Sequence, residues 1–183
     1  GSWAPWQRGR NGTTGPRFVA AWRHMVKVFR QEGADNVYWV WCPYVSNGLN
    51  PFMDFYPGGR WVNWIALDGY NWGEPRAWQS FSKIFDRSYR TLAKVAPKKP
   101  FMIAEIGSGE AGGSKAAWLN RTFRRQLPRL RRIKAVVWFD AVDGSDFRVD
   151  SSPAALDAFR NGIARRLYSG SGSWVARLSR HSG

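Results

Sequence analysis

This sequence is poor in the residues that build metal sites and disulfides. It contains one cysteine, Cys42, so no disulfide can form within the chain, and its two histidines, His24 and His181, are far apart. A zinc site or a cysteine–histidine nucleophile pair therefore lacks the side chains it needs. We expect no metal and no cofactor.

Long apolar runs and acidic residues are also scarce. No apolar stretch approaches the ~20 residues needed to cross a bilayer, which excludes an integral membrane protein. Residues 1–6 do not have the pattern of a signal peptide. Asp and Glu number 13 against 28 Lys and Arg, a net charge of +15, and 44% of the 183 residues are hydrophobic. This composition predicts a soluble, globular protein with a substantial core.

The positive charge concentrates in two segments. Residues 111–134 hold eight basic residues and no acidic one, and the preceding segment carries Lys83, Arg87, Arg90 and Lys94. Such runs are typical either of a polyanion-binding surface or of the solvated face of helices. Because no recognisable nucleic-acid module accompanies the charge, we favour the solvated face and expect no nucleic-acid partner.

Aromatic residues are abundant, and 12 of them are Trp. Short runs of aromatic and β-branched residues occupy four segments of the chain: 36–42, 61–67, 101–106 and 133–139. Runs of this kind are typical of strands that are buried on both faces, as in a parallel sheet.

Amphipathic segments with recognisable starts alternate with these runs. Capping residues and prolines predict four helix starts, at residues 14–16, at Pro75, at Ser114 and at residues 152–153. The repeated order of strand and helix predicts an α/β fold with a parallel sheet and right-handed crossovers.

Two further segments complete the predicted organisation. Residues 45–60 are rich in Asn, Gly and Pro, which predicts either a long loop or a short helix. Residues 169–183 have the composition of a loose tail after a domain that spans residues 1–168.

Functional side chains in β/α folds lie at the carboxyl ends of the strands. Glu105 is the most informative of them, because a carboxylate in an apolar strand costs several kcal/mol unless it is paired or hydrogen-bonded. It is either part of a structural ion pair or a catalytic carboxylate.

Neighbouring strand ends favour the catalytic interpretation. Trp41, Tyr70, Trp72 and Trp138 offer flat rings that suit the apolar faces of sugars, although core packing is the alternative for each Trp. Other strand-end residues can bind sugar hydroxyls; they are Asp68, Asn71 and Asp140.

These residues carry a family resemblance that covers about residues 1–168. Residues 104–108 (AEIGS) resemble the nucleophile strand of glycoside hydrolase family 26, and residues 68–72 (DGYNW) are similar to the end of its sixth strand. Residues 56–64 resemble the lead into that strand, and Trp138 matches an aromatic residue of the eighth. The family consists mainly of secreted endo-β-1,4-mannanases, with some mixed-linkage β-glucanases and β-xylanases, on a (β/α)8 barrel.

The resemblance implies a partial (β/α)8 barrel, from about the end of strand four through helix eight. It implies a retaining, endo-β-1,4-mannanase-like hydrolase of β-linked plant polysaccharide in an extracellular setting. Glu105 would be its nucleophile, and Tyr70 would hold this carboxylate ionised by a hydrogen bond. A non-catalytic carbohydrate-binding protein that uses only the aromatic residues is the alternative.

The first residues are similar to a further family motif. Residues 1–6 (GSWAPW) resemble the tail of the fourth-strand motif Glu-x-Asn-Gly-x-Trp, which implies that Trp3 and Trp6 contact substrate. In this alignment the general acid/base Glu lies three residues before Gly1, so we expect the isolated chain to be inactive and to require the N-terminal half of the barrel.

Overall fold

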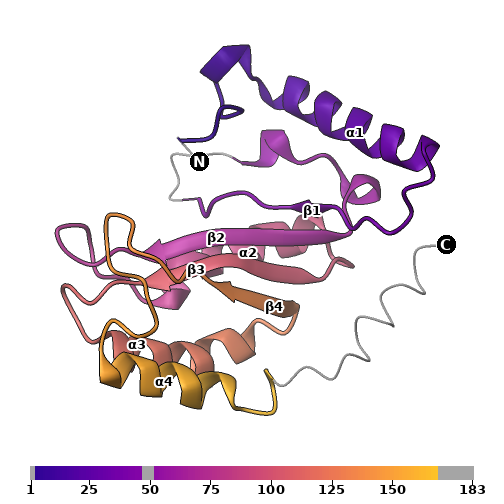
Figure 1. Ribbon diagram of the computed structural model, residues 1–183. Helices are drawn as coiled ribbons and strands as arrows, with labels where there is room; N and C mark the ends of the chain where they lie inside the picture. Colours follow the sequence, from indigo (N-terminus) through magenta and orange to yellow (C-terminus); the bar gives the residue numbers. More distant parts are fainter. Residues whose placement is uncertain (1–2, 47–51, 169–183) are drawn as a thin grey trace.

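A four-stranded parallel sheet forms the centre of the protein, which we describe from a computed structural model covering residues 3–46 and 52–168 (Figure 1). The strands lie in the order β1-β2-β3-β4, so strands that follow one another in the chain are neighbours in the sheet. Their bounds are Val40–Trp41 (β1), Trp64–Asn71 (β2), Phe101–Ser108 (β3) and Ile133–Trp138 (β4). The predicted tail, 169–183, lies outside the described residues.

The described residues form four α-helices, each with a side-chain cap at its start. They are α1 (Gly15–Gln31), α2 (Phe81–Val95), α3 (Lys115–Arg121) and α4 (Pro153–Ile163). The hydroxyl groups of Thr14, Ser80, Ser114 and Ser152 each accept a hydrogen bond from a backbone N–H in the first turn. The predicted starts of α1, α3 and α4 are therefore confirmed.

The second helix begins later than the sequence predicts. Pro75 was expected to open it, but the chain continues as a loop through Trp78, and Ser80 caps the helix instead. Proline is favoured in the first turn of a helix, but it has no side-chain oxygen that could cap the helix. Ser80, a few residues further on, has one, and α2 begins after it.

Shorter helical turns connect these elements. Residues 47–51 of the predicted loop or short helix at 45–60 lie outside the described residues. From residue 52 on, the chain forms two single 3-10 turns, η2 (Met53–Phe55) and η3 (Gly59–Trp61). The remaining ones are η1 (Arg10–Gly12), the π-helical turn η4 (Thr122–Gln126) that continues α3, and η5 (Leu127–Arg129).

The first two strands are displaced from their predicted positions. β1 contains only two of the residues predicted for 36–42, and β2 begins at Trp64 instead of Trp61 and runs on to Asn71. Trp61 belongs to η3, because aromatic content marks a buried residue without specifying a strand. As a result, Asp68 and Tyr70 lie within β2 rather than in the loop after it.

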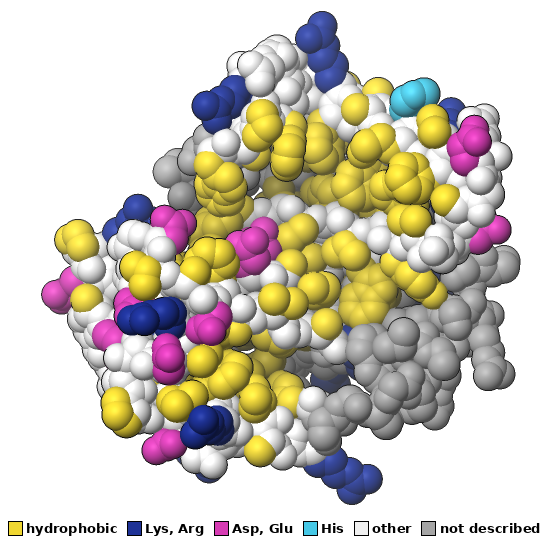
Figure 2. Space-filling model, in the orientation of Figure 1, with side chains coloured by type: hydrophobic (Ala, Val, Ile, Leu, Met, Phe, Trp, Pro, Cys, Tyr) yellow, Lys and Arg dark blue, Asp and Glu magenta, His cyan; other side chains and the backbone are white. Residues whose placement is uncertain are grey.

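The core lies between one face of the sheet and helices α2, α3 and α4. Ile65, Leu67, Ile103, Phe85 and Leu119 are fully buried there, each contributing roughly 1.5–3 kcal/mol. Figure 1 shows α2 behind the sheet and α3 and α4 beside β4, while α1 lies at the β1 side. The other face of the sheet is turned toward the viewer in Figure 2, where many hydrophobic side chains gather.

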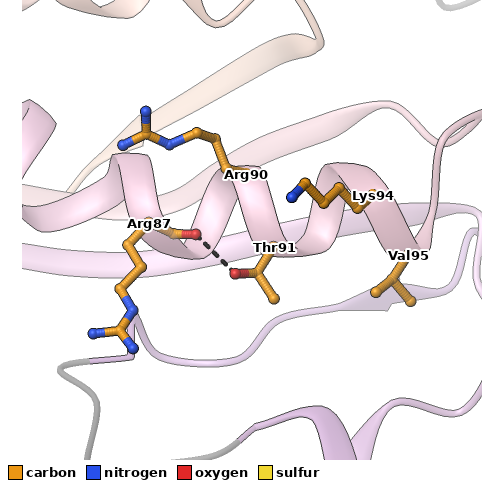
Figure 3. Close-up of a pocket in the computed structure, with 5 residues that line it drawn as sticks. All are labelled: Arg87, Arg90, Thr91, Lys94 and Val95. Atoms are coloured by element: carbon orange, nitrogen blue, oxygen red, sulfur yellow. Dashed lines mark hydrogen bonds between the residues drawn. The ribbon is translucent and has the colours of Figure 1, made fainter.

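The outer face of α2 is basic, as predicted. Arg87, Arg90 and Lys94 are exposed and line an open groove along this helix together with Thr91 and Val95 (Figure 3). Within the described part of the chain, none of the three cations lies over an aromatic ring.

Lys115 departs from the predicted solvated face of residues 111–134. Its side chain is fully buried, and Nζ donates hydrogen bonds to the carbonyl oxygens of Asp146 and Arg148 and to Oγ of Ser151. This buried ammonium group therefore holds the loop between β4 and α4.

Arg132 is a second exception to that face. Its guanidinium group lies over the ring of Phe101 and donates hydrogen bonds to three carbonyl oxygens at the end of α2 and just beyond it. Lys115 and Arg132 both donate hydrogen bonds to backbone carbonyl oxygens, and the charge pattern of a sequence does not reveal such contacts.

Among the helices of the described ranges, none has the length and apolar character needed to cross a membrane.

Candidate active site

The loops that follow β2, β3 and β4 meet at one end of the sheet (Figure 1). Acidic side chains gather on the same side of the molecule (Figure 2). Eight of the 13 acidic residues belong to these strand ends and loops: Asp68, Glu74, Glu105, Glu110, Asp140, Asp143, Asp146 and Asp150. An otherwise strongly basic chain therefore has a local acidic region at the carboxyl ends of its strands.

A β-bulge places Glu105 at the centre of this region. Leu67 pairs with Ile103, but the next residue of β2, Asp68, pairs with Glu105, so that Ala104 is an extra residue in β3. A bulge re-aims the side chains that follow it. Because residues paired across parallel strands project to the same face, Glu105 shares a face with Asp68.

Tyr70 provides the hydrogen-bond partner of Glu105. Its hydroxyl group donates to Oε2 of Glu105. Burial, and then this hydrogen bond, raise the pKa of Tyr70 above its ordinary value, so the phenol remains a donor at neutral pH. No ion pair involves Glu105 among the described residues, which argues against the structural ion pair that the sequence left open.

Asp68 lies beside Glu105 with a partner of its own. Cys42 donates a hydrogen bond from Sγ to Oδ1 of Asp68 over 3.1 Å. Burial raises the pKa of Asp68 to about 6; the hydrogen bond from Cys42 opposes this shift, and the nearby charge of Glu105 adds to it.

Aromatic rings form a wall around the Tyr70–Glu105 pair. The ring of Tyr70 lies 6.4 Å from that of Tyr44, 5.3 Å from Trp72, 5.5 Å from Phe139 and 5.1 Å from Phe147, measured between centroids. These separations are those of packed aromatic pairs. The wall therefore combines flat apolar surface with a hydrogen-bonded carboxylate.

Gly107 makes room for the innermost ring of the wall. A Cβ atom at this position would lie 2.7 Å from Cδ1 of Phe147, so a larger residue would displace that ring. Phe147 is fully buried, and its carbonyl oxygen accepts a hydrogen bond from Nε1 of Trp138 over 2.7 Å.

Three predicted aromatic residues have surface available to a ligand. Trp72 is half-buried in the wall, with the guanidinium group of Arg76 4.1 Å from its ring centroid. Trp3 is 62% exposed and meets Tyr44 edge-on at 5.3 Å, and Trp6 is 60% exposed.

The other predicted aromatic residues lie away from the wall. Trp41 is 3% exposed and packs in the core against Phe52 and Tyr56, which fits the alternative of core packing. Trp138 is turned toward α3 and α4, where its ring contacts Trp118 and Phe159. Successive residues of a strand point to opposite faces, so Phe139, the residue directly after β4, faces inward where Trp138 does not.

Two predicted polar residues have local hydrogen-bond partners. Asn71 is fully buried; it donates to Oγ of Ser108 over 2.9 Å and accepts from the backbone N–H of Gln79 over 2.7 Å. Asp140 is exposed and accepts from the backbone N–H of Val149 over 2.7 Å.

Sequence reasoning missed Tyr44, Phe139 and Phe147 as members of the site. Phe147 lies in a loop without a strand or helix pattern, so no periodicity marks it. The available signal was Gly107, because a glycine inside a strand indicates close approach of another group. No group of three or more His, Cys, Asp or Glu side chains suited to a metal ion occurs in residues 3–46 and 52–168.

Similarity to known proteins adds to this geometry, although no family model matches the chain. Endoglucanase H of Acetivibrio thermocellus is 40% identical over 172 residues, which represent 89% of this chain and 19% of that protein. The mannan endo-1,4-beta-mannosidase A and B of Caldalkalibacillus mannanilyticus is 30% identical over 115 residues, 61% of this chain and 20% of that protein. The chain thus spans about a fifth of the length of these relatives.

A solved structure shares the fold. The catalytic domain of a GH26 endo-beta-1,4-mannanase from Bacillus sp. JAMB-750 superposes with a TM-score of 0.70 at 19% identity, covering 98% of this chain and 50% of that one. The predicted partial (β/α)8 barrel is confirmed, and in sequence and fold the chain resembles family 26 as its motifs predict.

Proposed function

We propose that this chain is the nucleophile-bearing part of a retaining glycoside hydrolase of family 26, with endo-β-1,4-mannanase as its activity. The observation that carries the proposal is the carboxylate of Glu105, which accepts a hydrogen bond from Tyr70 within an aromatic wall. The bulge in β3 directs this carboxylate to the open face of the sheet. Among the described residues, Glu105 forms no ion pair. Action on an external polysaccharide implies an extracellular setting.

In the proposed reaction, Oε1 or Oε2 of Glu105 attacks the anomeric carbon and the glycosidic oxygen leaves. A retaining hydrolase also needs a second carboxyl group, about 5–5.5 Å away, that protonates this oxygen and later activates water. Asp68 does not suit that role, because it lies next to Glu105 on one sheet face instead of across the substrate from it.

The second carboxyl group would come from the other half of the barrel. The chain covers 50% of the solved mannanase domain, which leaves the remaining strands to supply the acid/base. The 183-residue chain by itself would then hold the nucleophile and part of the sugar platform, with Trp3, Trp6 and Trp72 as its accessible rings.

Activated fluorosugars test the nucleophile without requiring an acid. Fluoride leaves without a proton, so 2-deoxy-2-fluoro-β-mannobiosyl fluoride should form a covalent ester on Glu105, detected as a mass increase of its peptide. Glu105→Gln should abolish the label, and Glu74→Gln, at an exposed carboxylate on the same rim, should retain it. Labelling of another residue would contradict the assignment.

The role of Glu105 can also be tested in turnover. The chain joined to the first half of the Bacillus sp. JAMB-750 domain should hydrolyse mannan, and Glu105→Ala should lower kcat/KM at least about 10⁴-fold. Unchanged cleavage by this variant would contradict the proposed role. If the joined protein and its Glu105→Ala variant both bind mannan and neither hydrolyses it, the alternative of a carbohydrate-binding protein would be favoured.

A glucanase is the second candidate, because the relative with 40% identity is an endoglucanase and the mannosidase relative is 30% identical. Labelling by 2-deoxy-2-fluoro-β-cellobiosyl fluoride faster than by the mannobiosyl reagent would favour this activity. A xylanase, the remaining activity that the resemblance allows, would react faster with the corresponding xylobiosyl reagent.

A further inference from the structure

Four cations surround Trp61 at the opposite end of β2 from Glu105. Arg23, Lys27 and Arg30 come from α1, and Arg60 comes from η3. Their charged groups lie 5.8, 6.0, 5.6 and 5.0 Å, respectively, from the centroid of the Trp61 ring. We call these five residues the Trp61 cluster.

The helical spacing of the three α1 residues forms a row. Arg23, Lys27 and Arg30 stand at positions i, i+4 and i+7, which lie on one side of a helix. The row is about 10 Å long at 1.5 Å rise per residue. The tertiary fold then adds Arg60 by placing η3 against it.

Backbone contacts hold two of these side chains in place. Nε of Arg23 donates to the carbonyl oxygen of Pro57 over 2.9 Å, and Nη2 of Arg30 donates to that of Arg60 over 3.3 Å. Trp61 is 9% exposed, and its own carbonyl oxygen accepts a hydrogen bond from Nε1 of Trp22 over 2.9 Å. The cations are therefore organised around a buried ring instead of being dispersed in solvent.

Within residues 3–46 and 52–168, no carboxylate forms an ion pair with the cluster. The ion pairs of the described residues join Arg8 with Asp54, Arg90 with Asp86, and Arg148 with Asp146, and none includes a cluster residue. The face of an aromatic ring attracts cations but carries no net charge. Four like charges around one ring repel each other, and a bound polyanion would relieve that repulsion.

The features of the cluster suit carboxylate groups on a polymer. Guanidinium groups match carboxylates by paired hydrogen bonds, and a row of charges suits repeated anionic groups better than one small anion. Single-stranded nucleic acid stacks its bases on exposed rings, and the Trp61 ring is covered. The chemistry therefore favours an acidic polysaccharide.

We propose that the Trp61 cluster binds a polysaccharide that carries carboxylate groups, such as a polyuronate. The site is separate from the candidate active site, because Trp64, the first residue of β2, and Tyr70, its second to last, are about 20 Å apart at ~3.3 Å per residue. Binding there would attach the protein to an acidic matrix and does not depend on the proposed hydrolase activity.

The test measures binding of polygalacturonate to the 183-residue chain at 50 and 300 mM NaCl. The triple variant Arg23→Gln/Lys27→Gln/Arg30→Gln should weaken binding about tenfold at low salt, the sum of three partly screened charge contacts. The matched control is Arg87→Gln/Arg90→Gln/Lys94→Gln on the outer face of α2, which removes equal charge from cations that are not grouped around a ring (Figure 3). This control should weaken binding less than threefold.

The outcomes separate a site from a general charge effect. Equal losses in the two triple variants, or no salt-sensitive binding by the unaltered chain, would overturn the proposal. Tighter cluster-dependent binding of a DNA oligonucleotide than of polygalacturonate would also overturn it. Lys27→Glu, which removes no backbone hydrogen bond, provides a variant that keeps the fold, and it should weaken binding at least threefold.

Discussion

The two ends of β2 collect opposite charges around aromatic rings. At the carboxyl end, Asp68 and Glu105 lie within an aromatic wall, and Tyr70 and Cys42 donate hydrogen bonds to the two carboxylates. At the amino end, four cations surround Trp61, and none of them forms an ion pair with a described residue. A net charge of +15 describes neither end, because function depends on where the charges are placed.

The side chains at the two ends of β2 also differ in burial. The carboxyl end is held by buried groups, including Phe147 and Lys115, whereas the cations of the amino end are exposed. Substitutions at the carboxyl end should therefore change stability strongly, and those at the amino end should change binding with little effect on stability.

The largest expected loss of stability is that of Phe147→Ala. Removing this fully buried ring from its contacts with Tyr70 and Trp72 should lower the free energy of unfolding by about 4 kcal/mol, as measured by urea denaturation. Val142→Ala, in the same loop at a side chain that is 65% exposed, should change it by less than about 0.5 kcal/mol. Equal effects would show that the aromatic wall is not packed as described.

Lys115→Met should have the next largest effect, about 3 kcal/mol. The substitution keeps the buried chain length but leaves the carbonyl oxygens of Asp146 and Arg148 without their donor. Hydrogen exchange of residues 139–152 should also accelerate. Lys83→Met, at an exposed lysine of α2, is the matched control, and equal stability of the two variants would contradict the clamping role.

Asp68→Asn should give a smaller effect that depends on pH. The pKa of Asp68 rises from 3.8 to about 6 on folding, so the folded state retains a proton that the unfolded state releases. The resulting stability is present below pH 3.8 and is lost as the pH rises through 6. Asparagine does not titrate, so the stability of the variant relative to the unaltered chain should increase by about 2 kcal/mol between pH 4 and pH 7.

Thermal denaturation across this range measures the effect, with Asp157→Asn on α4 as the control. A stability difference between Asp68→Asn and the unaltered chain that stays constant from pH 4 to pH 7 would show that Asp68 does not keep its proton on folding.

The smallest effect on stability should come from the Trp61 cluster. Arg23→Gln/Lys27→Gln/Arg30→Gln changes exposed side chains and relieves repulsion, so the free energy of unfolding should move by about 1 kcal/mol or less. A loss of several kcal/mol, measured by urea denaturation, would indicate a structural role for these cations and would remove the contrast between the two ends.

Much of the fold was predictable because its signals are local. Thr14, Ser114 and Ser152 cap helices where the sequence places them, and apolar runs locate the four strands. The start of β2 was not predictable, because Trp61 is as apolar in a 3-10 turn as in a strand. The candidate nucleophile was visible because a carboxylate inside an apolar strand needs a physical reason.

The sequence by itself determined the α/β class, the caps of α1, α3 and α4, and the unusual position of Glu105. Only the tertiary structure decided which rings surround it, because Phe139 rather than Trp138 faces inward through strand parity, and Phe147 enters over Gly107 from a loop without periodicity. It likewise turned Lys115 from an apparent surface charge into a buried clamp and brought Arg60 to the row on α1. Local patterns specify elements, whereas contacts between residues distant in sequence arise only when those elements pack.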